Sequence, residues 1–229
     1  MTNNFIISLF DFFLPRFCPG CNKKLSTSER YICDVCINSI SLAPNLLIKI
    51  EFERKFSKKK LISGFTTPFV FEKDKELQQI IHSIKYSNKF AVGKRLGEII
   101  ADKCGEDIKY WTIDLIVPVP LHQLKKVNRG YNQSFYLAKG LGKSLNIKVS
   151  QRLLKRIKFT QTQTALSLVE RQENVGNAFK ARKKRLVKGK NILIIDDVIT
   201  TGATVNECAR VLKNAGAKNI FACSSAVAE

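Results

Sequence analysis

The stretch NILIIDDVITTGAT at residues 191–204 decides the fold of this chain. Its apolar run at 192–195 is typical of a strand that is buried on both faces of a parallel sheet. Two adjacent carboxylates follow this run, and then come two threonines and a glycine. Ligands of open α/β sheets bind in the crevice beyond the carboxyl ends of the strands. We therefore expect residues 196–204 to line a ligand site.

The residue types in this segment suit a phosphorylated ligand. Gly202 allows the backbone to approach a ligand closely. The N–H groups at the start of the next helix and the threonine hydroxyls would hold a phosphate. Asp196 and Asp197 suit ribose hydroxyls or the ligand shell of Mg²⁺. The alternative is an ordinary buried strand with an acidic turn, but adjacent carboxylates at a buried strand end repel each other, so a purely structural role explains them poorly.

The residues that follow predict a helix and a second strand. Apolar side chains recur at helical spacing, at Val205, Cys208, Ala209 and Leu212. Gly216 stands where a C-terminal cap belongs, and residues 220–227 have the composition of a strand. This strand–Asp-Asp–Thr-Thr-Gly–helix block resembles the 5-phosphoribosyl 1-pyrophosphate (PRPP) binding motif of type I phosphoribosyltransferases.

The length of 229 residues is enough for one large domain, or for one domain and a small module. No apolar run is long enough to span a bilayer. The run from Phe5 to Leu14 is short, is interrupted by Asp11 and lacks the pattern of a signal peptide, so we expect a short helix that packs on its own protein. These features predict a cytoplasmic protein without membrane insertion.

The formal net charge of +20 is concentrated in one part of the chain. Residues 115–195 hold 18 Lys and Arg against Glu170 and Glu173, and neither 115–169 nor 174–195 contains an acid. A positive field of this kind attracts polyanions and phosphorylated ligands. A general lysine bias is the alternative, because 28 of the 39 basic residues are Lys. Such a bias does not explain why both segments lack acids.

Two C-x2-C turns near the N-terminus predict a zinc site. They are Cys18-Pro-Gly-Cys21 and Cys33-Asp-Val-Cys36. Each turn presents two thiolates to one ion, and two turns complete a tetrahedral set. Four protein ligands leave no open position, so we expect a structural zinc ion rather than a catalytic one. The alternative is a set of four unrelated thiols.

The pattern along the chain predicts three parts. Residues 1–45 would hold the apolar helix and the four-cysteine zinc module. Residues 46–60 would form a basic linker, because they carry polar and basic runs without a sustained period. Residues 61–229 would form an α/β domain.

Within this domain, helices and strands are expected to alternate. Apolar residues at 77–84 and 92–99 repeat with helical spacing. Alternating β-type residues occupy 64–71, a buried strand that ends in prolines is expected at 114–120, and a helix follows Asn132. Such alternation favours a parallel sheet that is flanked by helices.

Three further segments resemble the competence protein F (ComF) family of phosphoribosyltransferase-like proteins. They are the cysteine array, the sequence VPVPLH at 117–122 with RGYNQ at 129–133, and the stretch 160–179. The resemblance implies an α/β, type I phosphoribosyltransferase-like parallel sheet with a small N-terminal zinc-binding module. It also implies a PRPP site and a role with single-stranded DNA during DNA uptake in natural transformation.

The resemblance and the residue chemistry together predict the PRPP contacts. Asp196 and Asp197 would hold ribose hydroxyls, partly through Mg²⁺, and residues 200–204 would hold the 5-phosphate. Backbone groups of Val119 and Pro120 would contact the pyrophosphate, which basic side chains would neutralise. The full set is Asp196, Asp197, Val198, Thr200, Thr201, Gly202, Ala203, Thr204, Val119, Pro120, Lys125, Lys126 and Arg129.

Basic residues later in the chain predict a nucleic-acid surface. This set comprises Lys155, Arg156, Lys158, Arg182, Lys183, Lys184 and Arg185. Bases could stack on interspersed aromatic rings, namely Tyr131, Tyr136 and Phe159. Lys85 is a further contact candidate for the PRPP site, and Arg171 and Asn174 lie in a stretch that either folds over the site or forms a solvated helix face. His122 is expected to cap a helix rather than to bind a ligand.

The sequence predicts the binding of PRPP better than it predicts catalysis. Phosphoribosyl transfer needs a clamp for the diphosphate, stabilisation of the ribose and a positioned nucleophile. The first two requirements are visible in the sequence, whereas no segment identifies a catalytic residue or a base-recognition pocket. The leading interpretation is a PRPP-binding factor for single-stranded DNA whose partners include a competence helicase or another DNA-processing protein. The alternative is an active phosphoribosyltransferase of nucleotide or base salvage.

Overall fold

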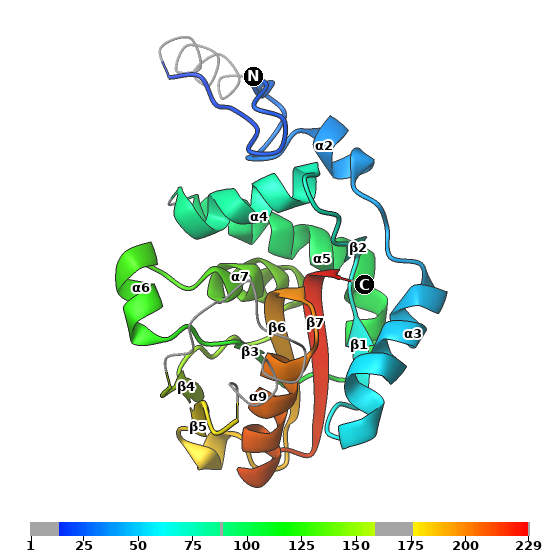
Figure 1. Ribbon diagram of the computed structural model, residues 1–229, viewed down its shortest axis with the longest axis vertical. Coiled ribbons are helices and arrows are strands. Elements are labelled where there is room, and N and C mark those ends of the chain that lie inside the picture. The colour runs from blue at the N-terminus through cyan, green and yellow to red at the C-terminus, as the bar shows by residue number, and fades with distance from the viewer. Residues whose placement is uncertain (1–13, 88, 159–175, 229) are drawn as a thin grey trace.

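A parallel β-sheet forms the centre of the molecule. The computed structural model describes residues 14–87, 89–158 and 176–228. Within these residues the sheet has five strands: β1 (Gly64–Thr66), β2 (Phe69–Val70), β3 (Leu115–Pro118), β6 (Asn191–Ile199) and β7 (Asn219–Val227). The order is β1-β7-β6-β3, β2 also pairs with β7, and every pairing is parallel (Figure 1).

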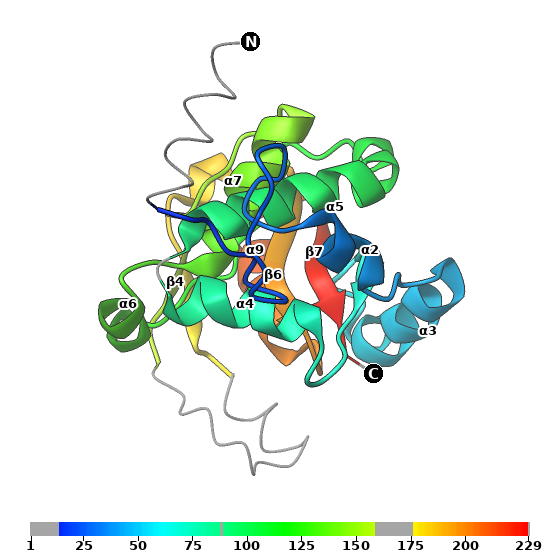
Figure 2. The same ribbon diagram turned by 90° about the horizontal axis from the view of Figure 1, so that it is seen from above.

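Helices cover both faces of this sheet (Figures 1 and 2). One face packs against α4 (Glu76–Tyr86), α5 (Phe90–Tyr110) and α7 (Gln133–Leu145), and the other against α3 (Asn45–Phe56) and α9 (Ala203–Asn214). Alternate residues of β6 divide between the two cores. Leu193 and Ile195 belong to the first core, and Ile192 and Ile194 to the second. The structure thus confirms the expected parallel sheet with flanking helices.

The remaining elements lie around this frame. They are α2 (Asp34–Ser39), η1 (Ser57–Lys59), α6 (Gln123–Arg129), β4 (Leu154–Arg156), β5 (Phe179–Ala181) and η2 (Lys184–Leu186). Strands β4 and β5 form a separate antiparallel pair. Among the described ranges, no helix has both the length and the apolar character that a membrane span requires.

Most predicted elements are confirmed. The helix expected at 205–212 is α9, Gly216 after it has φ +93°, and the strand expected at 220–227 is β7. Helix α5 runs further than the predicted 92–99, to Tyr110. Its apolar stripe continues through three buried residues at helical spacing, Ile100, Cys104 and Ile108.

The expected basic linker at 46–60 is helical. Helix α3 and η1 occupy almost all of it, and α3 packs on the sheet through Ile48, Phe52 and Phe56. The pattern is misleading because Glu51 and Lys55 look like solvent-exposed charges. They are instead an ion pair, and each side chain is only 3% exposed.

The cysteine module shares its core with the main domain. Cys18, Cys33 and Cys36 belong to the same buried cluster as Leu77 and Ile80 of α4. Figure 1 shows the module above α4, at the top of the view. The module is therefore packed onto the main domain and does not have a core of its own. Most of the apolar run from Phe5 to Leu14 lies outside the described residues.

Two glycines allow α5 and α7 to approach closely. A Cβ atom on Gly97 would lie 2.2 Å from the Leu137 carbonyl oxygen, and one on Gly140 would lie 2.0 Å from the Lys94 carbonyl oxygen. Backbone atoms cannot move aside as a side chain can. A side chain at either position would therefore push the two helices apart.

We expect Gly140→Ala to lower the free energy of unfolding by about 3 kcal/mol, because the added methyl group overpacks a helix–helix contact. Gly105→Ala is the matched control in α5, since its Cβ would meet only the end of the Leu145 side chain, at 3.3 Å. The control should be neutral, or more stable by up to about 1 kcal/mol through helix propensity. Urea denaturation of both variants measures the difference, and equal stabilities would contradict the close approach.

Candidate functional site: the carboxyl end of the sheet and the cysteine cluster

Asp196 and Asp197 lie near the carboxyl end of β6 and face residues from two helices. Asp196 Oδ1 accepts hydrogen bonds from Ser134 Oγ at 2.9 Å and from the Asp197 backbone N–H at 3.0 Å. Asp197 Oδ2 forms an ion pair with Lys85 Nζ at 2.5 Å. Ser134 comes from the first turn of α7, and Lys85 from the last turn of α4. Three elements that are distant in sequence thus meet at the acid pair.

The two carboxyl groups respond differently to burial. Burial and the adjacent Asp197 carboxylate raise the pKa of Asp196 well above its ordinary value. Burial acts in the same direction on Asp197, but the charge of the Lys85 ammonium, together with hydrogen bonds with Asp196 and Lys85, outweighs it and lowers the pKa of that carboxyl. Acid pairs with divergent pKa values are typical of functional sites, because repulsion between them has no structural benefit.

Basic side chains gather beside the acid pair. The guanidinium of Arg129 donates to Tyr86 Oη at 3.1 Å and lies 4.9 Å from the centre of the Tyr86 ring, next to Lys85 in the chain. Burial, followed by the charges of Arg156, Arg129 and Lys85, lowers the pKa of Lys125. These four cations therefore influence one another, and we call them the cationic cluster.

Arg156, which is predicted from the sequence to bind nucleic acid, lies in this cluster. Its guanidinium lies 5.3 Å from the centre of the Phe179 ring, which is opposite it in the β4–β5 pair. Burial lowers the pKa of Arg156, and the charge of Asp196 opposes this effect. Lys126 is exposed, in contrast to Lys125.

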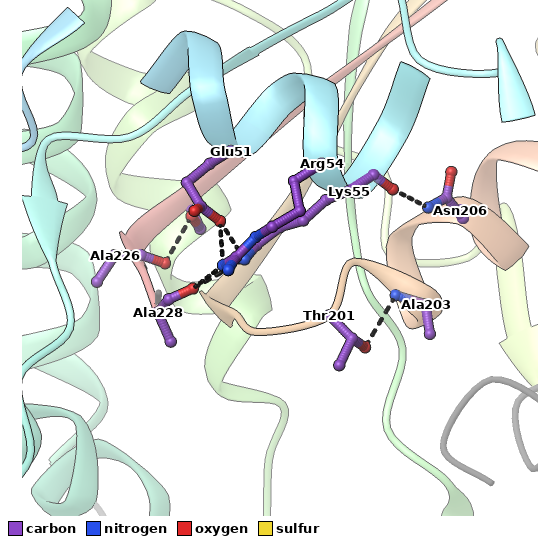
Figure 3. A network of polar contacts seen from close by, with 9 residues as sticks. Glu51, Arg54, Lys55, Thr201, Ala203, Asn206, Ala226 and Ala228 are labelled. Carbon is purple, nitrogen blue, oxygen red and sulfur yellow. Dashed lines mark hydrogen bonds and ion pairs between the residues drawn. The ribbon is translucent and has the colours of Figure 1, made fainter. Parts of the chain in front are cut away.

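The phosphate loop, defined here as residues 200–204, connects β6 to α9. Gly202 has φ +72° and is the N-cap of α9, and Thr201 Oγ1 accepts a hydrogen bond from the Ala203 N–H at 3.3 Å (Figure 3). The first turn of α9 directs its backbone N–H groups toward the carboxyl end of the sheet. This arrangement is suited to an anion at the helix N-terminus.

The turn after β3 differs from expectation. The Val119 N–H donates to the Ile195 carbonyl at 2.9 Å, and the Val119 carbonyl accepts from Asn132 Nδ2 at 2.9 Å. Pro120 has no N–H group. The two residues therefore shape the turn, and neither has a spare backbone donor for a pyrophosphate. His122 caps α6, as expected, through its Nδ1 and the Leu124 N–H.

Among the other basic residues expected to bind nucleic acid, Lys158 donates to the Gly176 carbonyl at 3.3 Å, and the rest fall into two groups. Lys155 lies directly opposite Lys180 in the β4–β5 pair, and Arg182 follows β5. Like charges in opposite positions destabilise a strand pair, so an anion at this face would offset their repulsion. Lys183, Lys184 and Arg185 lie around η2, before the amino end of β6, whereas Asp196 lies near its carboxyl end.

The four cysteines of the two C-x2-C turns converge. Their sulfur atoms all lie within 4.8 Å of one another, and Cys21 Sγ and Cys33 Sγ are 3.7 Å apart. Four ligands at about 2.3 Å from one zinc ion would be about 3.8 Å apart. A Cβ atom on Gly20 would lie 2.9 Å from Cys36 Sγ, so only glycine fits this turn. The set can hold a metal ion, and thiolate donors suit zinc.

The surroundings of Cys18 favour a thiolate. Burial acts to raise the pKa of this thiol, but N–H groups of Cys33, Cys21 and Gly20 donate to the sulfur, outweigh burial and lower the pKa to about 7. Burial raises the pKa values of Cys33 and Cys36. Metal ligands must be deprotonated, so Cys18 is the thiol of the cluster that is best prepared for binding.

This chain is similar in sequence to known proteins. The phosphoribosyl transferase domain family matches residues 132–227, which include α7, β6, α9 and β7. The chain is similar to Competence protein F of Haemophilus influenzae, with 29% identity over 208 residues, 89% of this chain and 86% of that protein. This similarity and the matched domain support the ComF family for this chain. DNA utilization protein YhgH of Salmonella typhimurium is 27% identical over 225 residues, 90% of this chain and 95% of that protein. Competence protein ComFC of Streptococcus pneumoniae is 28% identical over 158 residues, 69% of this chain and 66% of that protein.

The roles of two residues of this site were not predicted from the sequence. Ser134 is missed because nothing in its neighbourhood marks it, although it opens a helix that begins near the carboxyl end of β3. Arg156 is assigned to DNA because its neighbours are basic. Tyr131 is only partly exposed and donates to the Ile84 carbonyl, so its ring is less open to stacking than expected. Phe159, Arg171 and Asn174 lie outside the described residues.

We expect the ComF-family cysteine cluster to bind one zinc ion per chain, because four thiolates complete its coordination. Elemental analysis of protein purified without chelator should find one zinc equivalent, and Cys18→Ser should lose it. Cys104→Ser is the matched control, since Cys104 is a buried thiol outside the cluster, with a pKa that burial raises to about 11. Wild-type protein without zinc would contradict the assignment.

Proposed function

We propose that the carboxyl end of the sheet binds PRPP together with Mg²⁺, and that the protein uses this site while it handles single-stranded DNA in the cytoplasm during DNA uptake. The observation that carries the proposal is the largely buried Asp196–Asp197 pair. It lies between a helix N-terminus with a glycine cap and a cluster of four cations. A ribose with a phosphate at one end and a pyrophosphate at the other complements this arrangement.

Each part of PRPP has a counterpart in the site. The carboxylates of Asp196 and Asp197, next to Val198, would accept hydrogen bonds from the ribose hydroxyls. The phosphate loop would hold the 5-phosphate. The cationic cluster, with Lys126 at its exposed side, would neutralise the pyrophosphate, and its two lysines would do so as point charges. Compared with the sequence prediction, this assignment keeps Lys85, adds Arg156 and gives Val119 and Pro120 a shaping role only.

The donor set fits Mg²⁺ with PRPP. Carboxylate oxygens are hard ligands that suit this ion, which is usually bound by one or two carboxylates and the phosphates of the substrate. The raised pKa of Asp196 fits the same view, because a divalent cation would offset the repulsion between two adjacent carboxylates in a buried setting. When bound, Mg²⁺ would neutralise the pyrophosphate, and Asp196 and Asp197 would orient it relative to the ribose.

The DNA part of the proposal has two supports. Similar proteins are named for competence and for DNA utilization. In addition, Lys155, Lys180 and Arg182 form a basic strip on the β4–β5 pair, and η2 adds a second basic group. A polyanion without sequence preference suits such surfaces. Delivery of single strands would require a helicase or another DNA-processing protein as partner.

The alternative is an active phosphoribosyltransferase in nucleotide or base salvage. The matched phosphoribosyl transferase domain favours it. Such an enzyme would consume PRPP and release pyrophosphate in the presence of a purine or pyrimidine base. DNA would not alter this reaction.

Binding isotherms test the proposal. PRPP with Mg²⁺ and single-stranded DNA should each bind the wild-type protein, and each isotherm should be repeated in the presence of the other ligand. No binding of PRPP would refute the site, whereas PRPP binding without DNA binding, together with pyrophosphate release on addition of a base, would favour the salvage enzyme.

A further inference from the structure

We propose that helix α3 positions the phosphate loop and that Lys55 is the residue through which it acts. The proposal rests on the assignment of residues 200–204 to the 5-phosphate. Lys55 is linked to both flanks of the loop, to one by its side chain through Ala228 and to the other by its backbone carbonyl through Asn206 (Figure 3). A lysine between the two ends of a ligand loop can set the width of that loop.

The first flank is held through the end of β7. Lys55 Nζ donates to the Ala228 carbonyl at 2.8 Å, and the Ala228 N–H donates to the Ile199 carbonyl at 3.0 Å. Ile199 is the residue directly before the loop. The ammonium also pairs with the buried Glu51 carboxylate, which Arg54 Nη2 contacts at 2.7 Å. The side chain of Lys55 is thus fixed at one end of the loop.

The second flank is held through α9. Asn206 Nδ2 donates to the Lys55 carbonyl at 2.8 Å, and the Asn206 N–H donates to the Gly202 carbonyl at 2.9 Å. The contact also satisfies a carbonyl in the last turn of α3, where no helical partner exists. At Gly202, a Cβ atom would lie 3.1 Å from Lys55 Cβ and 3.0 Å from Phe56 Cε1. Helix α3 therefore packs directly under the turn of the loop.

Stability alone explains these polar groups poorly. Well-packed apolar residues in place of a buried ion pair are often neutral or stabilising, because burial removes the hydration of both charges. Asn206 is 3% exposed, and within the described part of the chain its Oδ1 has no hydrogen-bond partner, which is costly. What the ion pair and the amide do provide is a directional link from one helix to both ends of one loop.

Calorimetry with two ligands tests this role. Ribose 5-phosphate probes the phosphate loop, and pyrophosphate with Mg²⁺ probes the cationic cluster. The variants are Glu51→Gln with Lys55→Met, which keeps the shape of the pair, and Asn206→Ala. The matched control is Lys49→Met with Glu53→Gln, which makes the same chemical changes at exposed positions of α3.

The double variant in α3 and Asn206→Ala in α9 should each weaken ribose 5-phosphate binding about tenfold and change pyrophosphate affinity by less than about twofold, because only the loop is misplaced. The control should change neither affinity. Amide hydrogen exchange of the ligand-free variants should be faster at residues 199–206 and unchanged in β3. Equal loss of both ligands, or unchanged ribose 5-phosphate affinity with unchanged exchange, would overturn the proposal. If the wild-type protein bound neither ligand, the assignment of the loop would fail, and the exchange data would still decide whether α3 positions it.

Discussion

Replacement of both Asp196 and Asp197 by Asn is expected to abolish PRPP binding while the protein stays folded. The two carboxylates would hold the ribose hydroxyls and, through PRPP, the Mg²⁺ ion. Hydrogen bonds to charged groups contribute about 1.5 to 3 kcal/mol each, so the loss of two such acceptors predicts a fall in affinity of more than about a hundredfold. Few other changes in the site are expected to lower the PRPP affinity this much.

Folding should survive this double change for structural reasons. Asn has the shape of Asp, and burial, which raises the pKa of Asp196, opposes a charge at that position. Lys85 would lose its ion pair, but its side chain is 26% exposed and can be hydrated. Repulsion between the two acids would also disappear.

Calorimetry with PRPP and Mg²⁺ measures the effect, and thermal unfolding checks the fold. Asp114→Asn is the matched control, because Asp114 pairs with Lys190 at 2.9 Å before the amino end of β3. The control should retain full affinity. Thr201→Val should weaken binding less than the double variant, since the backbone N–H groups of the phosphate loop remain. Unchanged affinity in the double variant would refute the assignment.

The affinity for single-stranded DNA is expected to fall steeply as salt rises and to depend little on base sequence. Neutralisation of Z phosphates on a single strand gives a slope of log K against log salt of about −0.7Z. Replacement of Lys183, Lys184 and Arg185 by Ser should therefore make the slope shallower by about 2 and weaken binding of all sequences about equally. All three residues are exposed, so the core should tolerate the change.

A second triple variant separates the two basic groups. Lys155, Lys180 and Arg182 changed to Ser should have a similar effect on the slope, and relief of the Lys155–Lys180 repulsion should keep the strand pair intact. Lys103→Ser with Lys109→Ser on α5 is the control, because acids surround these residues and no DNA contact is expected there. DNA binding that is undetectable at low salt, or that does not respond to salt, would contradict the prediction and favour the salvage enzyme.

The sheet and its ligand end could be predicted because their signals are local. The apolar run at 192–195, the acids after it and the helical spacing at 205–212 lie within one continuous stretch, and local periodicity is the strongest information in a single sequence. The cysteine cluster was predictable for a similar reason, since each C-x2-C turn contributes two ligands on its own. The concentration of basic residues was visible in the composition, but the division of these residues into two surfaces was not.

The errors share a cause, which is pairing between distant residues. Glu51 and Lys55 look solvated until the core that surrounds them is known. Arg156 looks like a DNA contact until β4 pairs with β5 and brings its guanidinium near Asp196. Nothing near Ser134 in the sequence indicates the Asp196 carboxylate, 62 residues later, that it contacts. A pattern along the sequence predicts only whether such residues are exposed. Pairing between distant residues in the folded chain changes that exposure.

The position of β7 determines when the sheet can form during translation. Strands β1 and β2 pair with β7, and Gly64 lies opposite Phe221, so their partner is synthesised more than 150 residues after them. Until then β1 lacks its strand partner, β2 has only the antiparallel bridge from Phe69 to Leu42, and the link from Lys55 through Ala228 to Ile199 cannot form. Such long-range pairing makes folding slow and leaves strand edges open to aggregation. The nascent chain would thus acquire a finished phosphate loop only as one of its last folding events, and chaperones would have most to protect before that step.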